Sequence, residues 1–102
     1  MNERKRIEIA EMKLQLYYEQ GGWCAACGKP VGTDDGELAH RIPQRRWALA
    51  KYGPRIIHHH DNLALTHPGA CNDAMSISNQ PVECERLAKS IADKMLGVGG
   101  EA

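Results

Sequence analysis

The sequence predicts an α+β fold, in which a short pair of antiparallel strands lies between an N-terminal and a C-terminal helix. The two helices are predicted by apolar residues that recur at helical spacing near both ends of the chain. The strands are predicted by two short apolar runs, 37–42 and 63–65, which a long polar excursion separates. At 102 residues the chain is expected to form one domain, 1–102, with its core over 23–79.

The N-terminal helix is expected over about residues 3–20. Ile7, Ala10 and Leu14 recur near helical spacing among Glu and Lys residues. Gly21 follows this segment, and glycine is common just past the C-terminus of a helix.

The C-terminal helix is expected over about residues 81–96, with apolar residues on one face (Val82, Leu87, Ala88, Ile91 and Met95). Asn79 is expected to cap this helix, with Pro81 in its first turn. Another helix is expected to begin near Cys71 or Asn72 and to run to about Asn79.

The sequence marks the end of the first strand and the segment that follows it. The run 37–42 stops at Pro43, which cannot donate to a sheet. Residues 44–52 have a helix-favouring composition and are expected to form a short helix or an ordered loop, which Gly53-Pro54 closes. We expect the strands to pair antiparallel, with the basic excursion on the outside.

The compartment is inferred from what the chain lacks. It has no run of about 20 apolar residues that could span a bilayer, and residues 1–7 lack the apolar run of a signal peptide. We therefore expect a cytoplasmic protein without a membrane partner. In that compartment four cysteines are expected to be metal ligands more often than disulfides.

Two pairs of residues have the spacing of zinc ligands. Cys24 and Cys27 flank two alanines before the first strand, and His67 and Cys71 follow the second strand. Structural Zn²⁺ takes four nitrogen or sulfur ligands, so these pairs predict a zinc ion that clamps both ends of the strand pair. The alternatives for the first pair are a redox dithiol, which expects a preceding strand and a following helix, or ordinary buried cysteines. Cys84 is left over, and a buried or free thiol accounts for it.

The charge distribution points to an anionic partner. Thirteen basic residues balance thirteen acidic ones, but residues 38–60 contain no Asp or Glu and four of the five histidines. This segment carries the residues expected to contact nucleic-acid phosphate: Arg41, Arg45, Arg46, Lys51, Arg55 and His58. The plainer alternative is a solvated basic face.

The order of these motifs resembles a known family. Cys-x2-Cys is followed by Leu-Ala-His-Arg-Ile-Pro (38–43), then by Asn-Leu-x-Leu (62–65), then by a ligand pair and Asn72. This order is similar to that of the HNH endonucleases of the ββα-metal superfamily, in the small bacterial or phage type with a structural zinc. The resemblance covers residues 24 to about 77 and implies a zinc-clamped ββα-metal core.

The resemblance also implies roles for individual residues. His40 would be the general base that deprotonates the attacking water. Asn62 would orient His40, and Asn72 would bind a catalytic Mg²⁺ or Mn²⁺. The residue before the base is usually an acidic or His ligand, and here it is Ala39. His58 and His59 match an Ile-His-His motif of the subgroup, and one of them could replace the missing ligand.

The leading hypothesis is therefore a metal-dependent endonuclease that cuts or nicks DNA with little sequence preference. A homodimer would make two cuts on a duplex easier. The alternative, from another class, is a non-catalytic zinc-stabilised module that binds nucleic acid. Nicking of a plasmid by the intact protein and by His40→Ala discriminates the two hypotheses.

Overall fold

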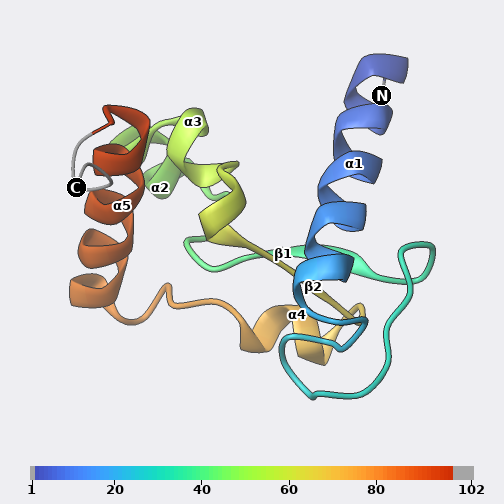
Figure 1. Ribbon diagram of the computed structural model, residues 1–102. Coiled ribbons are helices and arrows are strands. Elements are labelled where there is room, and N and C mark those ends of the chain that lie inside the picture. Colours follow the sequence, from blue (N-terminus) through green and yellow to red (C-terminus); the bar gives the residue numbers. More distant parts are fainter. Residues whose placement is uncertain (1, 98–102) are drawn as a thin grey trace. The chain divides into compact units, whose positions relative to one another are not determined.

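The computed structural model describes residues 2–97 and shows a small α+β fold (Figure 1). In this part of the chain five α-helices accompany a two-stranded antiparallel sheet. The chain divides into two compact units: unit 1 takes in Met1–Ala39 and Ala64–Met75, and unit 2 takes in His40–Leu63 and Ser76–Ala102. The predicted α+β class is confirmed, and the predicted single domain and HNH core stay predictions.

Helix α1 (Glu3–Glu19) is the predicted N-terminal helix of unit 1. Asn2 caps it, because the Asn2 side chain accepts a hydrogen bond of 2.8 Å from the Lys5 N–H. The helix ends at Gln20, and Gly21 follows with φ of +68°, a conformation that favours glycine.

The sheet joins β1 (Glu37–His40) to β2 (Leu63–Thr66), close to the predicted runs. Every residue of β2 is buried. Within unit 1 the side chain of Gln20 holds β2, since it accepts a hydrogen bond from the Leu65 N–H at 2.8 Å and donates one to the Leu65 carbonyl at 2.9 Å. The end of α1 is thus tied to the middle of β2.

Helix α4 (Ala70–Ala74) is shorter than the sequence predicts, because it does not continue to Asn79. The reason lies in unit 2, where the Ile77 N–H donates a 2.8 Å hydrogen bond to the Arg41 carbonyl and the Ile77 side chain is buried in the core. A continued helix would give that N–H to its own turn. Tertiary contacts therefore override the local helical pattern.

Unit 2 contains the remaining helices. They are α2 (Arg46–Tyr52), α3 (Pro54–Ile57), the 3-10 helix η1 (His60–Asn62) and α5 (Pro81–Met95). Their core brings together buried residues from the three α-helices and the segments before α2 and α5: Ile42, Ala48, Ile57, Ile77, Cys84 and Ala88. Helix α5 was predicted almost to the residue, whereas α3 was not predicted.

The cap of α5 differs from the prediction. Gln80, not Asn79, occupies the N-cap, and its side chain makes no capping hydrogen bond. Pro81 occupies the first turn as predicted, and a proline disfavours the helical conformation for the residue before it. Gln80 is that residue, so Asn79 lies one position too early.

None of the helices in residues 2–97 combines the length with the apolar character that crossing a membrane would require.

Candidate metal centre and histidine site

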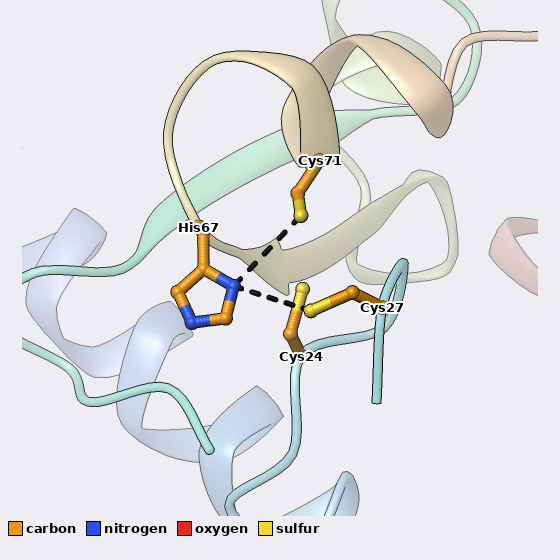
Figure 2. Close-up of side chains that lie close together, drawn as sticks. All are labelled: Cys24, Cys27, His67 and Cys71. Atoms are coloured by element: carbon orange, nitrogen blue, oxygen red, sulfur yellow. Dashed lines mark hydrogen bonds between the residues drawn. The ribbon is translucent and has the colours of Figure 1, made fainter. Parts of the chain in front are cut away.

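Unit 1 brings the four predicted zinc ligands together. Cys24, Cys27, His67 and Cys71 place their ligand atoms within 4.8 Å of one another (Figure 2). The His67 Nδ1 lies 3.5 Å from the Cys27 sulfur and 3.8 Å from the Cys71 sulfur. A tetrahedron with metal–sulfur distances of about 2.3 Å has edges of about 3.8 Å. The group can therefore hold a metal ion, and its ligand set suggests zinc.

The loop that carries Cys24 and Cys27 is shaped by backbone hydrogen bonds. The Cys24 N–H donates to the Lys29 carbonyl at 2.7 Å, and the Gly28 N–H donates back to the Cys24 carbonyl at 2.9 Å. Gly28 has φ of +77°, which the turn requires. The turn thus carries both sulfurs of the pair into the group of four ligand atoms.

A second contact orients His67. Its Nε2 lies 2.8 Å from the Pro30 carbonyl oxygen, so Nε2 carries the proton and donates. In the neutral ring Nδ1, which faces the sulfurs, is then the unprotonated nitrogen that a metal requires. The Pro30 carbonyl acts as the outer partner that histidine ligands commonly have.

The electrostatics of the sulfurs also fit a cation. Burial opposes ionisation of Cys24, yet the N–H groups of Cys27, His67 and Ala26 and the Cys27 thiol lower its pKa to about 6. Burial and the neighbouring Cys27 and Cys24 sulfurs raise the pKa of Cys71 to about 11. Without a cation the cluster therefore ionises only in part, and a divalent metal would stabilise all three thiolates.

Cys84 does not belong to this group. It is buried on α5 in unit 2, and its thiol donates to the Ile77 carbonyl at 3.2 Å. Burial raises its pKa, as do the charges near it on balance. A structural thiol accounts for it.

His40 is the last residue of β1 and lies in unit 2. Its Nε2 is 3.2 Å from the Nδ1 of His58, and the two rings meet edge to face with centroids 5.3 Å apart. Burial, and to a smaller extent repulsion from His58 when that ring is protonated, lowers the pKa of His40 to about 4. The imidazole is therefore neutral at pH 7 and is available as a proton acceptor.

Asn62 fixes the backbone beside both histidines. It is fully buried, and its side-chain oxygen accepts a hydrogen bond of 2.8 Å from the Ile42 N–H. Its amide group donates to the carbonyls of Ile42 at 3.0 Å and Ile57 at 2.8 Å. Ile57 directly precedes His58, and Ile42 lies two residues after His40. One buried amide thus holds the two segments that carry the histidine pair.

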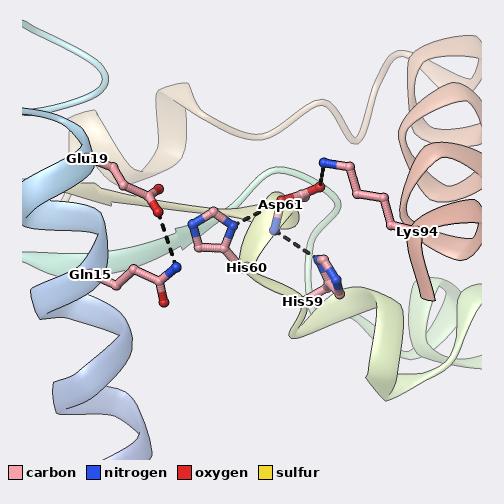
Figure 3. A network of polar contacts seen from close by, with 6 residues as sticks. All are labelled: Gln15, Glu19, His59, His60, Asp61 and Lys94. Carbon is pink, nitrogen blue, oxygen red and sulfur yellow. Dashed lines mark hydrogen bonds and ion pairs between the residues drawn. The ribbon is translucent and has the colours of Figure 1, made fainter. Parts of the chain in front are cut away.

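His59, also in unit 2, contacts η1. Its Nδ1 accepts a 3.1 Å hydrogen bond from the Asp61 N–H and so caps η1 (Figure 3). The Asp61 carboxylate binds His60 at 2.9 Å and forms an ion pair with Lys94 of α5. Lys94, and then His60, lower the pKa of Asp61. Of the two histidines expected at the site, His58 is therefore the one that contacts His40.

Asn72 makes a contact that the sequence did not predict. Its side-chain amide donates a 3.0 Å hydrogen bond to Glu37, the first residue of β1, and both residues belong to unit 1. Ala39 is completely buried, and its methyl group cannot bind a cation, so the position before His40 offers no ligand. The only sequence signal for Glu37 was its place as the acid immediately before the segment 38–60.

The residues expected to contact phosphate are exposed, and all lie in unit 2: Arg41, Arg45, Arg46, Lys51, Arg55 and His58. Lys51 differs from the others because its ammonium lies 2.6 Å from the Glu85 carboxylate. Glu85 also accepts a hydrogen bond from the Tyr52 hydroxyl at 2.6 Å. Lys51 is therefore partly neutralised, which the local sequence could not show.

The fold and the site define a small α+β protein with a Cys3His group suited to a metal ion. No family model, no curated protein and no solved structure matches this chain.

Proposed function

We propose that the protein is a metal-dependent endonuclease that hydrolyses DNA phosphodiester bonds, with His40 as the general base. One observation carries the proposal: a half-buried histidine at the end of a strand lies 3.2 Å from a second histidine, and a buried asparagine binds the backbone next to both. A general base must be unprotonated at working pH, and a pKa of about 4 satisfies this condition, while it also makes His40 a weaker base than an ordinary histidine. It must also be held in place, and the hydrogen bonds of Asn62 to Ile42 and Ile57 fix the backbone close to both histidines.

In the proposed reaction His40 takes a proton from water. The water oxygen then forms a bond to phosphorus, the bond from phosphorus to the leaving oxygen breaks, and solvent supplies the leaving oxygen with a proton. The exposed arginines of unit 2 would bind the phosphates on either side of the bond that is cut. Contacts of this kind carry little sequence preference.

The catalytic ion would be held by oxygen atoms. The Asn72 amide donates through its nitrogen, which leaves its oxygen for a cation, and the Glu37 carboxylate lies beside it. Mg²⁺ and Mn²⁺ prefer such oxygen ligands and keep several waters. When bound, the ion would stabilise the charge that develops on the phosphate oxygens. The Cys3His group would hold a structural zinc ion.

A plasmid-nicking assay with Mg²⁺ or Mn²⁺ tests the proposal. The intact protein should convert supercoiled to open-circular DNA, and His40→Ala, purified identically, should lose at least about a hundredfold in rate. Zinc content and circular dichroism of both proteins establish that the variant is folded. Equal nicking by the two proteins would rule out His40 as the base.

A second candidate is a non-catalytic zinc-stabilised module that binds nucleic acid. The burial of Ala39 favours it, because the position next to His40 carries no metal ligand. DNA binding by the intact protein, without nicking by either protein, would select this candidate. The homodimer stays a prediction, and sedimentation with and without DNA tests it.

A further inference from the structure

We propose that His58 is a positioning residue that sets the tautomer of His40, so that Nδ1 of His40 is the atom that accepts the proton. The sequence placed His58 among the phosphate contacts. The structure places its Nδ1 3.2 Å from the Nε2 of His40, within hydrogen-bonding distance. The inference rests on the proposed function only for the identity of the reaction, since the tautomer can be measured without it.

When both imidazoles are neutral, the single proton between the two nitrogens has two possible positions. If His40 donates through Nε2, its Nδ1 keeps a lone pair and can act as a base. If His58 donates through Nδ1, the proton of His40 is on Nδ1 and His40 has no free lone pair. The choice between these arrangements therefore decides whether His40 can act at all.

The chemistry of imidazole favours the first arrangement. In free histidine the tautomer with its proton on Nε2 is the more stable one. When His40 donates through Nε2, His58 accepts at Nδ1 and carries its own proton on Nε2, so both rings have the preferred tautomer. In the second arrangement both rings have the less stable tautomer. The contact between a Nε2 and a Nδ1, rather than between like nitrogens, makes this distinction possible.

The backbone around the pair keeps the contact in place. The His58 N–H donates to the Pro54 carbonyl at 2.9 Å, and Ile57 is buried and bonded to Asn62. On the other side, the Arg41 N–H donates to the Asn62 carbonyl at 2.9 Å. Residues that follow His40 and precede His58 are thus held by one asparagine. The ring of His58 is exposed, but its backbone is not free to withdraw.

The pair also accommodates the product of the proton transfer. Once His40 has accepted a proton at Nδ1, its Nε2–H donates to His58 as a charge-assisted hydrogen bond, which is stronger than the neutral one. The contact therefore strengthens as the reaction proceeds. A residue that acts in this way should affect kcat rather than KM.

The test compares three variants of the zinc-loaded full chain. His58→Asn keeps an acceptor at the position of Nδ1, because the asparagine oxygen is attached to the same carbon as that nitrogen. His58→Gln places its acceptor one bond further out, and His58→Ala removes it. Long-range proton–nitrogen NMR spectra without DNA or added Mg²⁺ report which His40 nitrogen is protonated.

The expected spectra show His40 protonated on Nε2 in the intact protein and in His58→Asn, and a mixture of tautomers in His58→Ala and His58→Gln. In the nicking assay His58→Ala should lower kcat by about tenfold to a hundredfold at unchanged KM, with most of the loss restored in His58→Asn. A proton on Nδ1 of His40 in the intact protein, or one unchanged tautomer in all variants, would overturn the proposal. Equal losses of kcat in His58→Ala and His58→Asn would also overturn it. If the spectra are as expected but no protein nicks DNA, the proposed function fails and the tautomer assignment stands.

Discussion

Replacement of Asn62 by alanine should be strongly destabilising, because this side chain satisfies three backbone groups at once. The change removes the acceptor of the Ile42 N–H and the donor to the carbonyls of Ile42 and Ile57. A buried polar group without a partner costs about 1–3 kcal/mol. Relaxation and entry of water offset part of the sum, so we expect a loss of about 3–5 kcal/mol in the free energy of unfolding.

Asn62→Asp provides a sharper comparison, since it keeps the shape and changes only one group. Its first oxygen can still accept from the Ile42 N–H, but its second oxygen faces the two carbonyl oxygens that the amide nitrogen served. At pH 7 the loss should be at least as large as in Asn62→Ala. Burial should raise the pKa of the new carboxyl, so the stability of this variant should rise as the pH falls.

Urea unfolding of the zinc-loaded proteins measures these effects. A domain of this size has a total stability of about 5–15 kcal/mol. The loss of about 3–5 kcal/mol in the free energy of unfolding of Asn62→Ala therefore corresponds to a fall in Tm of about 15–25 °C. Asn79→Ala is the matched control, because Asn79 is exposed in the same unit, and it should change stability by less than about 0.5 kcal/mol. The reasoning is refuted if the free energy of unfolding of Asn62→Ala lies within about 1 kcal/mol of that of the intact protein. It is also refuted if Asn62→Asp is as stable as the intact protein at pH 7.

Three further predictions concern the metal centre, the pH dependence and the DNA contacts. Cys24→Ser should lose stoichiometric zinc, whereas Cys84→Ser should keep it; equal metal content in the two variants would contradict the assignment of the ligands. The folded-state pKa of His40, about 4, lies below its ordinary value of 6.5, so between these values the folded state binds fewer protons than the unfolded state. The free energy of unfolding should therefore fall as the pH drops from 6.5 to 4. Allowing for partial exposure, His40→Gln should remove about 1–2 kcal/mol of this fall in urea unfolding, and an unchanged pH profile would disprove the shift. Arg46→Ala should reduce the salt slope of DNA binding by about 1 and Lys51→Ala by less, because Glu85 pairs with Lys51; equal slopes would show that the pair does not persist with DNA.

The elements that the sequence predicted well have local causes. Helix α1 has a cap at Asn2 and a glycine just past its end, and both signals lie within the helix's own stretch of sequence. Where the prediction was wrong, distant residues decide. Helix α4 ends at Ala74 because Ile77 is buried and bonded to Arg41, and the five apparent helical residues after Ala74 carry no sign of that contact.

The two parts of the candidate site differ in the same way. Each half of the metal centre is a pair of ligands in one short segment. Local sequence therefore leaves open only whether the two pairs lie close together in the fold. The histidine pair depends on more than its own segments. Three histidines follow one another from His58 to His60, and which of them contacts His40 is decided by the turn from α3 into η1. That turn is held by the buried side chain of Asn62, whose backbone partners no sequence pattern reveals.

The burial of Ala39 gives a physical reason why no acidic residue stands at this position. A carboxylate there would be completely desolvated, at a cost that only a close cation could offset. Side chains alternate along a strand, so Glu37 lies on the same face of β1 as Ala39, but it is exposed and already paired with Asn72. The acidic group is thus available two residues earlier, at a position where its charge can remain hydrated. Replacing Ala39 by Asp should therefore destabilise the strand rather than supply a ligand to the proposed catalytic ion, and under the same proposal loss of the Glu37 carboxylate should weaken binding of Mg²⁺ or Mn²⁺.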